Sequence, residues 1–306
     1  MSARPTYLQP QIDRYFDRLK LPQEQRRYRV AGLPDADLLN YLTLLQKLHL
    51  AEIPFENFGL HYSAHHSLSV HPEQLFNKIV GDNNGRGGYC MENNCLFGTL
   101  LTSLGFTLYS GAGRVFEGTS SGGWMHYINF VTIGDVKYHV DVGFGGDGPI
   151  APMPLDPAGT VQKHIQPASA RLQWRNIPGN VDPNQRLWVY EYRRSDDSDW
   201  EMKYAYSELE FQPQDYFAMN YFASTSRHIF FTSRIVAHKN ILEDGELMGK
   251  MSMVAATLKW NIRGEKTKEI EFKSEAERVE GLDKYFGIKL TQAERDGITG
   301  MPSEIK

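Results

Sequence analysis

The sequence predicts an α+β fold, because the spacing of its apolar residues changes along the chain. In the first third they recur with the 3.6-residue period of amphipathic helices, and from Phe106 onward they recur with the period of two that is typical of strands. The last third mixes the two patterns. We therefore expect a small helical bundle, then a β-rich subdomain, then a mixed α/β part.

The helices of the first part are indicated by apolar stripes. The stripe Leu38, Leu42 and Leu45 has Asp35 or Asp37 before it as a cap. Gly105 is placed to end the last helix, since glycine adopts the left-handed conformation that closes helices. The predicted helical stretches lie at Ile12–Leu19, around Leu38–Leu45, from Pro72 through Val80, and from Met91 to Leu104.

Alternating runs bounded by Gly, Pro, Asn and Asp predict the strands. They lie at Thr107–Val115, His126–Ile133, Val136–Val142, Leu187–Tyr192, Met202–Phe211, Ile229–Ala237 and Met253–Ile262. Two loops, 149–157 and 177–185, are rich in turn-forming residues. Ser274 and Glu277 predict a capping box at the start of a late helix.

Composition limits the function classes. The chain has 306 residues, of which 41% are hydrophobic and 23% charged, and its net charge is −4. This charge gives no global basic field for nucleic acid or an anionic membrane. No apolar run approaches the roughly 20 residues that span a bilayer, and the start lacks a signal-like segment, so we expect a cytoplasmic protein. Two cysteines do not make a disulfide framework, so we expect reduced thiols.

Cys90 follows the glycine-rich run Gly85-Arg86-Gly87-Gly88-Tyr89, just before the helix predicted from Met91. A helix N-terminus favours the thiolate, because its unpaired N–H groups and dipole are positive. The glycines allow backbone and substrate to approach closely. The pattern favours a reactive thiol, and a small buried cysteine beside a turn is the alternative.

A β-hairpin is the clearest local signal, with Gly-Asp as a two-residue turn between the runs 126–133 and 136–141. Pairing across this turn places Ile128 opposite Asp141 and His126 opposite Gly143. His126 and Asp141 would then be diagonal neighbours about 7–8 Å apart, within reach of an imidazole and a carboxylate. Gly143 would leave room for that approach.

A carboxylate on one imidazole nitrogen fixes the tautomer and supports the imidazolium form, so His126 paired with Asp141 would be able to take a proton from the Cys90 thiol. Two alternatives remain at this point. One is a surface contact between His126 and Asp141 without function. The other is that His139, which lies on the same predicted face as Asp141, takes the place of His126.

Other polar groups are weaker candidates. The histidines 61, 65, 66 and 71 lack a metal-ligand spacing, so we expect a polar loop and no metal site. Glu56 and Arg86 are the only charges in their apolar or glycine-rich surroundings, and a partly buried ion pair is conceivable. Cys95, inside the predicted helix, is expected to be a buried spectator.

Together, several separated motifs resemble the arylamine N-acetyltransferase family, in a fungal-type member. They are Ile-Pro-Phe-Glu-Asn at 53–57, Arg-Gly-Gly-Tyr-Cys-Met-Glu-Asn-Asn at 86–94, His126, Val-Asp-Val-Gly-Phe-Gly at 140–145, Asp-Tyr-Phe-Ala-Met-Asn at 215–220 with Ser-Thr-Ser at 224–226, and Leu-Asp-Lys-Tyr-Phe-Gly-Ile-Lys-Leu at 282–290. The resemblance covers nearly the whole chain. It departs from the family pattern at Met91, Met125 and Arg227.

The resemblance implies a papain-like core in which Cys90 is the nucleophile, His126 its base and Asp141 the orienting acid, with no functional position for His139. It implies a helical bundle over 1–106, a β-barrel over 107–211, an interdomain segment over 212–231 and an α/β lid over 232–306. The other implied sites are a structural ion pair of Glu56 and Arg86, a substrate pocket with Phe55 and Phe144, and a coenzyme A region at Gly145, Phe222, Thr225 and Ser226.

The implied function is ping-pong acyl transfer from acetyl-CoA, or from malonyl-CoA, to an arylamine or arylhydrazine, as in xenobiotic metabolism. Arg227 with His228 is a candidate source of positive charge for the phosphates of coenzyme A, and a solvated pair is the alternative. Because the same three residues can pass an acyl group to water, a papain- or transglutaminase-like amide hydrolase or thioesterase is the alternative function.

Overall fold

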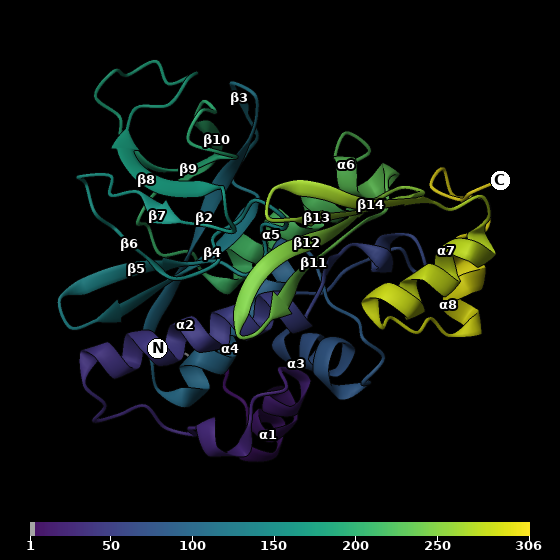
Figure 1. Cartoon of the computed structure of the whole chain (residues 1–306), viewed down its shortest axis with the longest axis horizontal. Coiled ribbons are helices and arrows are strands. Elements are labelled where there is room, and N and C mark those ends of the chain that lie inside the picture. The colour runs from purple at the N-terminus through teal and green to yellow at the C-terminus, as the bar shows by residue number, and fades with distance from the viewer. Residues whose placement is uncertain (1–3) are drawn as a thin grey trace.

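Four helices form the N-terminal part of the computed structural model, which describes residues 4–306 (Figure 1). They are α1 (Gln9–Arg18), α2 (Asp35–Glu52), α3 (Pro72–Phe76) and α4 (Cys90–Leu104), with short helical turns at Gln23–Gln25, Phe58–Leu60 and Asn77–Gly81. The apolar side of α4 is completely buried in a core shared with α1 and α2. As predicted, Gly105 ends α4 in the left-handed conformation, with φ of 90°.

The middle of the chain forms an antiparallel sheet that rolls into a nearly closed barrel. The strand order is β6-β5-β4-β2-β10-β9-β8-β7, and its two edge strands, β6 and β7, follow one another in the sequence. Burial of aromatic side chains inside the barrel, among them Phe130, Tyr190, Tyr204 and Tyr206, stabilises it. The strands are β2 (Thr107–Glu117), β3 (Ser120–Ser121), β4 (His126–Ile133), β5 (Val136–Val140), β6 (Met153–Pro154), β7 (Gln162–Lys163), β8 (Ser169–Arg175), β9 (Leu187–Arg193) and β10 (Glu201–Tyr206).

The remaining elements form a second sheet with helices at both ends. They are α5 (Pro213–Thr225), α6 (Phe230–Ser233), β11 (Val236–Glu243), β12 (Glu246–Val254), β13 (Thr257–Ile262), β14 (Glu265–Glu271), α7 (Glu275–Gly281), a helical turn at Leu282–Phe286 and α8 (Gln292–Gly297). The short strand β1 (Phe55–Glu56) joins this sheet beside β11, so the N-terminal part is hydrogen-bonded to the C-terminal sheet close to Cys90.

The predicted hairpin is present, but its ladder is shorter than predicted. Ile133 pairs with Val136 and Phe130 with His139, and the pairing ends at Asn129 with Val140. Beyond that point the pairings of Ile128 with Asp141 and of His126 with Gly143 are wrong, because the chain leaves the sheet after β5. A Cβ at position 143 would lie 2.8 Å from the Cα of Cys90, so Gly143 makes room for α4 and not for His126.

Other predicted strands also differ from the structure. The first part of 229–237 is the helix α6, because Phe231 packs on Phe55 and Tyr89 instead of continuing a strand. The run 253–262 is divided by a turn between β12 and β13. Strand β14 was not predicted, because its sequence Glu-Lys-Thr-Lys-Glu-Ile-Glu has almost no apolar alternation.

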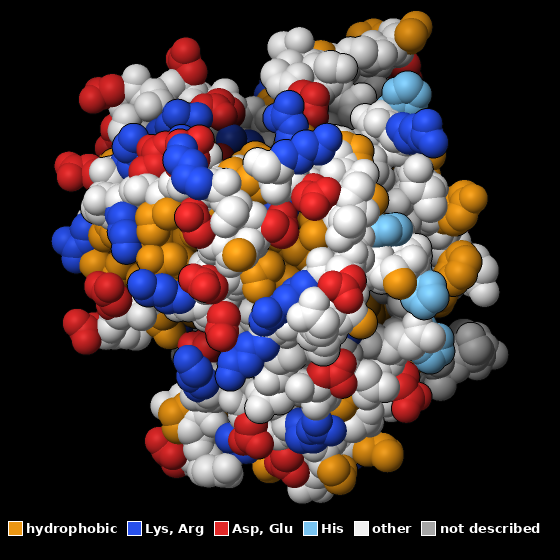
Figure 2. Space-filling view, turned by 90° about the vertical axis from the view of Figure 1, so that its right-hand side faces the viewer, with side chains coloured by type: hydrophobic (Ala, Val, Ile, Leu, Met, Phe, Trp, Pro, Cys, Tyr) orange, Lys and Arg blue, Asp and Glu red, His pale blue; other side chains and the backbone are white. Residues whose placement is uncertain are grey.

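The molecular surface agrees with the modest net charge. On the face shown in Figure 2, basic and acidic side chains are intermingled rather than gathered into a patch of one sign. Within the described residues, every helix is too short or too polar to cross a lipid bilayer.

Candidate active site

Cys90 is the first residue of α4, one residue earlier than predicted, and is 7% exposed. The two glycines before it are required by close packing, since a Cβ at position 87 would lie 1.8 Å from the carbonyl oxygen of Pro54 and one at 88 would lie 2.5 Å from Cβ of Glu92. The Glu92 carboxylate accepts the N–H of Tyr89 and closes the helix start. The thiol of Cys90 therefore lies at the positive end of α4.

His126 is the first residue of β4 and is held in place by backbone pairing with Gly113 of β2. Its Nε2 lies 2.7 Å from Oδ2 of Asp141, and both side chains are buried. The Cys90 sulfur is the second group that acts on this imidazole and raises its pKa, and the thiol itself donates to the Met125 carbonyl oxygen at 3.6 Å. Sulfur, imidazole and carboxylate thus lie next to one another, with the imidazole hydrogen-bonded to the carboxylate.

The electrostatics of these three groups favour an imidazolium. Burial by itself would lower the pKa of His126. The Asp141 carboxylate and the Cys90 sulfur raise this pKa by more than burial lowers it, to about 10. For Asp141 the effect of burial is the opposite, since burial by itself would raise the pKa of the carboxyl. His126 and the other hydrogen-bond donors to Asp141 outweigh burial and hold this pKa well below its usual range. At neutral pH the pair is therefore an imidazolium and a carboxylate.

Two further side chains, which our sequence analysis did not name, hold Asp141. Asn94 donates to Oδ1 at 2.8 Å and Tyr204 donates to Oδ2 at 2.9 Å, while the backbone N–H of Gly143 donates to Oδ1 at 2.7 Å. Asn94 lies one helical turn after Cys90, a spacing that places both on one face of α4 and was readable in the sequence. No local signal pointed to Tyr204.

His139, the alternative to His126, does not contact the thiol. It is fully buried, and its Nε2 lies 3.0 Å from the hydroxyl of Tyr204. The structure therefore brings His126 and not His139 between Cys90 and Asp141.

A pocket of about 410 Å³ opens onto Cys90 and His126. This size is ordinary for a small-molecule site, and Phe55 and Phe144 both lie on its wall. The ring of Phe144 meets His126 edge-on at 5.4 Å. Met125, one of the departures from the family pattern, also lies on this wall, and sequence reasoning missed other lining residues, namely Tyr89, Glu117, Phe230 and Phe231.

The four residues assigned to coenzyme A by resemblance lie next to this pocket rather than on its wall. Gly145, with φ of 94°, follows the wall residue Phe144. Phe222 is 51% exposed, Thr225 is exposed, and Ser226 is half-buried at the end of α5. Ala223 and His228, their neighbours, do line the pocket.

Glu56 and Arg86 form the ion pair that the sequence suggested, with Nε of Arg86 2.9 Å from Oε1 of Glu56. Both are buried, and Glu56 also accepts the N–H groups of Phe58 and Gly87. Burial raises the pKa of Glu56, but Arg86 and Lys78 lower it below its ordinary value. Arg86 also binds Glu294 of α8 at 2.6 Å, so the pair ties the loop before Cys90 to the C-terminal part.

Replacing Glu56 by Gln is expected to destabilise the fold by about 3 kcal/mol, because removal of one partner leaves the buried Arg86 guanidinium poorly compensated. The free energy of unfolding, measured with chemical denaturant, checks this. Glu269→Gln is the matched control, since that residue forms an exposed pair with Lys266 at 2.7 Å, and it should not change stability measurably. Equal stability of the Glu56 variant and wild type would contradict a structural role for the pair.

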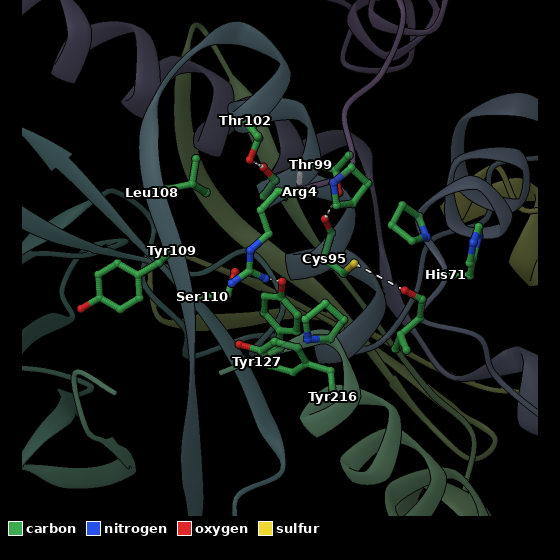
Figure 3. A pocket seen from close by; sticks show the side chains of 15 residues that line it. Arg4, His71, Cys95, Thr99, Thr102, Leu108, Tyr109, Ser110, Tyr127 and Tyr216 are labelled. Carbon is green, nitrogen blue, oxygen red and sulfur yellow. Dashed lines mark hydrogen bonds between the residues drawn. The ribbon is translucent and has the colours of Figure 1, made fainter. Parts of the chain in front are cut away.

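Cys95 lines a different cavity, of about 260 Å³ (Figure 3). The Cys95 thiol donates a hydrogen bond to the carbonyl oxygen of Val70, and burial raises the pKa of this thiol to about 12. It is therefore a poor nucleophile, as expected of a spectator. Within residues 4–306 no group of three or more His, Cys, Asp or Glu side chains is arranged to hold a metal ion.

Comparisons with known proteins identify the family and the fold. A family profile described as N-acetyltransferase matches residues 38–295. The N-malonyltransferase FDB2 of Fusarium pseudograminearum is 35% identical, over 96% of this chain and 93% of that protein. The arylamine N-acetyltransferase 2 of Mesocricetus auratus is 29% identical, over 91% of this chain and 94% of that protein. The structure of the Mycobacterium marinum arylamine N-acetyltransferase in complex with CoA superposes with a TM-score of 0.76 and 25% identity, covering 96% of this chain and 99% of that one.

Proposed function

Because the chain belongs to the arylamine N-acetyltransferase family, we propose that it transfers an acyl group from an acyl-coenzyme A thioester to the nitrogen of an arylamine or arylhydrazine, through an acyl-Cys90 intermediate. The observation that carries the proposal is the arrangement of Cys90 and His126 on the wall of one small-molecule pocket, with His126 hydrogen-bonded to the buried Asp141. The same three groups are what a papain-like core requires.

In the first half-reaction the Cys90 sulfur attacks the thioester carbonyl carbon. A new carbon–sulfur bond forms to Cys90, the bond to coenzyme A breaks, and the departing thiolate takes a proton from the His126 imidazolium. The backbone N–H of Cys90, at the start of α4, is the donor we assign to the carbonyl oxygen as it gains negative charge.

In the second half-reaction the amine nitrogen attacks the acyl-Cys90 carbonyl. Neutral His126 takes a proton from the nitrogen, the carbon–sulfur bond breaks, and the thiolate–imidazolium pair is restored. Aromatic amines suit this step because they are largely uncharged near neutral pH and their rings can pack on Phe55 and Phe144.

We propose acetyl-CoA as the acyl donor, with malonyl-CoA as the alternative. A malonyl group carries an extra carboxylate, and the described residues of the pocket wall include no lysine or arginine to pair with it. Glu117, which lines the same pocket, would repel that carboxylate. The name of the Fusarium relative makes malonyl-CoA a necessary arm of any donor test.

Incubation with acetyl-CoA and no amine is expected to leave the Cys90 peptide heavier by one acetyl group and the Cys95 peptide unchanged, as read by mass spectrometry. The physical reason is that only Cys90 has a base within hydrogen-bond reach. Parallel incubations with propionyl- and malonyl-CoA rank the donors. Addition of an arylhydrazine should then remove the label and yield the acylated hydrazine.

The same experiment separates the alternative function. A hydrolase or thioesterase would release coenzyme A equally fast with and without the amine and would form no acylated hydrazine. Absence of label on Cys90, with free coenzyme A still released, would overturn the covalent mechanism.

A further inference from the structure

His139 is a buried titratable group that the reaction above does not use. It lies in β5 between two paired strands, opposite Phe130 of β4 and Met153 of β6, and its side chain has no exposed surface. Its ring stacks on Tyr206 at 4.8 Å between ring centres. This placement fixes the direction of the imidazole inside the barrel.

The hydrogen-bond roles around His139 follow from the chemistry of its neighbours. Asp141 is a carboxylate and only accepts, so the single hydroxyl hydrogen of Tyr204 points to Oδ2, at 2.9 Å. The Tyr204 oxygen must then accept from Nε2 of His139, at 3.0 Å. His139 is therefore the Nε2–H tautomer, and its Nδ1 has no hydrogen-bond partner among the described residues.

An unpaired buried nitrogen is costly, and an apolar side chain would fill this aromatic site without that cost. The only hydrogen bond of the His139 side chain points along a line that ends at Asp141. Two donors, His126 and Tyr204, then share Oδ2 of Asp141. A donor that polarises the Tyr204 hydroxyl strengthens its bond to the carboxylate.

We propose that His139 is a positioning residue that acts through Tyr204 to set how much negative charge Asp141 presents to His126. We call the hydrogen bond from His139 to Tyr204, continued to Asp141, the arm. With the arm intact, Tyr204 neutralises part of the Asp141 charge, and His126 releases its proton more readily to the departing thiolate. The proposal rests on the proposed function, because it assigns His126 the proton transfers.

The other titratable groups near this arm do not compete with it. They are Tyr190 on β9, Tyr204 and Tyr206 on β10, His126 on β4, and Asp141. Burial raises the pKa of each of the three tyrosines well above its ordinary value, so Tyr204 stays a proton donor. Burial lowers the pKa of His139 to about 4, so His139 stays neutral where the enzyme works.

The test compares His139→Leu with His139→Gln, whose amide nitrogen can take the place of Nε2–H. The readouts are the pH at which the His126 ring loses its proton, followed by NMR of the ring nitrogens, and the pH dependence of Cys90 alkylation by iodoacetamide. Loss of the arm leaves more negative charge facing His126. The alkaline midpoint should therefore rise by about half a pH unit in the leucine variant and stay in place in the glutamine variant.

Tyr204→Phe removes the whole hydrogen bond and should raise the same midpoint by about one pH unit. His164→Leu is the matched control, because His164 is another buried barrel histidine with an unpartnered Nδ1, bonded to the Gly148 carbonyl and not to the Asp141 network. It should leave the midpoint unchanged. Equal midpoints in His139→Leu and wild type, or equal shifts in the leucine and glutamine variants, would overturn the proposal.

Wild-type protein supplies a test that needs no variant to fold. The ring-nitrogen spectra should show His139 as the Nε2–H tautomer from about pH 5 to about pH 9, and an Nδ1–H tautomer would overturn the proposal. None of these readouts uses a coenzyme A thioester. Failure of acetyl-CoA to label Cys90 would therefore count against the proposed function alone, and an unshifted midpoint against the role of His139 alone.

Discussion

Replacement of Cys90 by Ala should abolish acyl transfer, with a loss of at least about 10⁴-fold in turnover. Alanine offers no nucleophile, and the next side chain on that face of α4, Asn94, is already committed to Asp141. The measurement is release of the coenzyme A thiol from acetyl-CoA in the presence of an arylhydrazine. The fold should be retained, because the lost sulfur contributes little to the core.

Cys95→Ala is the matched control for this prediction. Its thiol lies in the separate cavity, bonded to the Val70 carbonyl, and has no contact with His126 or the pocket. Turnover of the Cys95 variant should stay within about twofold of wild type, in keeping with a substitution outside the site. Substantial turnover in the Cys90 variant would remove the nucleophile assignment, and with it the covalent mechanism.

Replacement of Asp141 by Asn is expected to lower turnover by about 10³- to 10⁴-fold. Asp141 accepts from four donors, which are His126, Tyr204, Asn94 and the N–H of Gly143. An amide has one acceptor oxygen, and its NH2 group is itself a donor. In some of these contacts two hydrogen-bond donors would therefore face each other. Without the carboxylate charge, the pKa of His126 should fall, and the imidazolium that supports the Cys90 thiolate is lost.

The reactivity of Cys90 gives a second readout for this variant. Alkylation at neutral pH should slow together with turnover, because both depend on the thiolate–imidazolium pair. Asp147→Asn is the matched control. Asp147 is an acid six residues along the chain, and it is paired with Lys203 and Lys250, away from His126. That variant should lose stability and keep the alkylation rate, and a wild-type rate in the Asp141 variant would contradict the orienting role.

Much of the local structure was predictable, because it depends on contacts within a few residues. The end of α4 at Gly105 follows from the freedom of glycine to adopt positive φ. The hairpin register up to Asn129 with Val140 follows from a two-residue turn and strict alternation. Where local signals were weak, as in the charged strand β14, the structure depends on pairing with a neighbouring strand and was not predicted.

Some features of the site were likewise predictable from local sequence, and others were not. The glycines before Cys90, the start of α4 and the hairpin that carries His126 toward Asp141 each have a signature a few residues long. The choice between His126 and His139 did not, because both lie on the same hairpin, and only the position of α4 relative to β4 decides which imidazole meets the sulfur. The contact of Tyr204 with Asp141 could not be predicted for the same reason, since Tyr204 lies on β10, far from the hairpin in the sequence.

The sequence by itself determined the α+β class of the fold and the family. Tertiary structure alone decided which of two histidines faces the thiol, which donors saturate Asp141, and that Gly143 makes room for α4 instead of the hairpin. Backbone hydrogen bonds and turn geometry act over a few residues and leave a readable pattern. The packing of a helix against a closed barrel joins side chains far apart in the chain, and no local period records it.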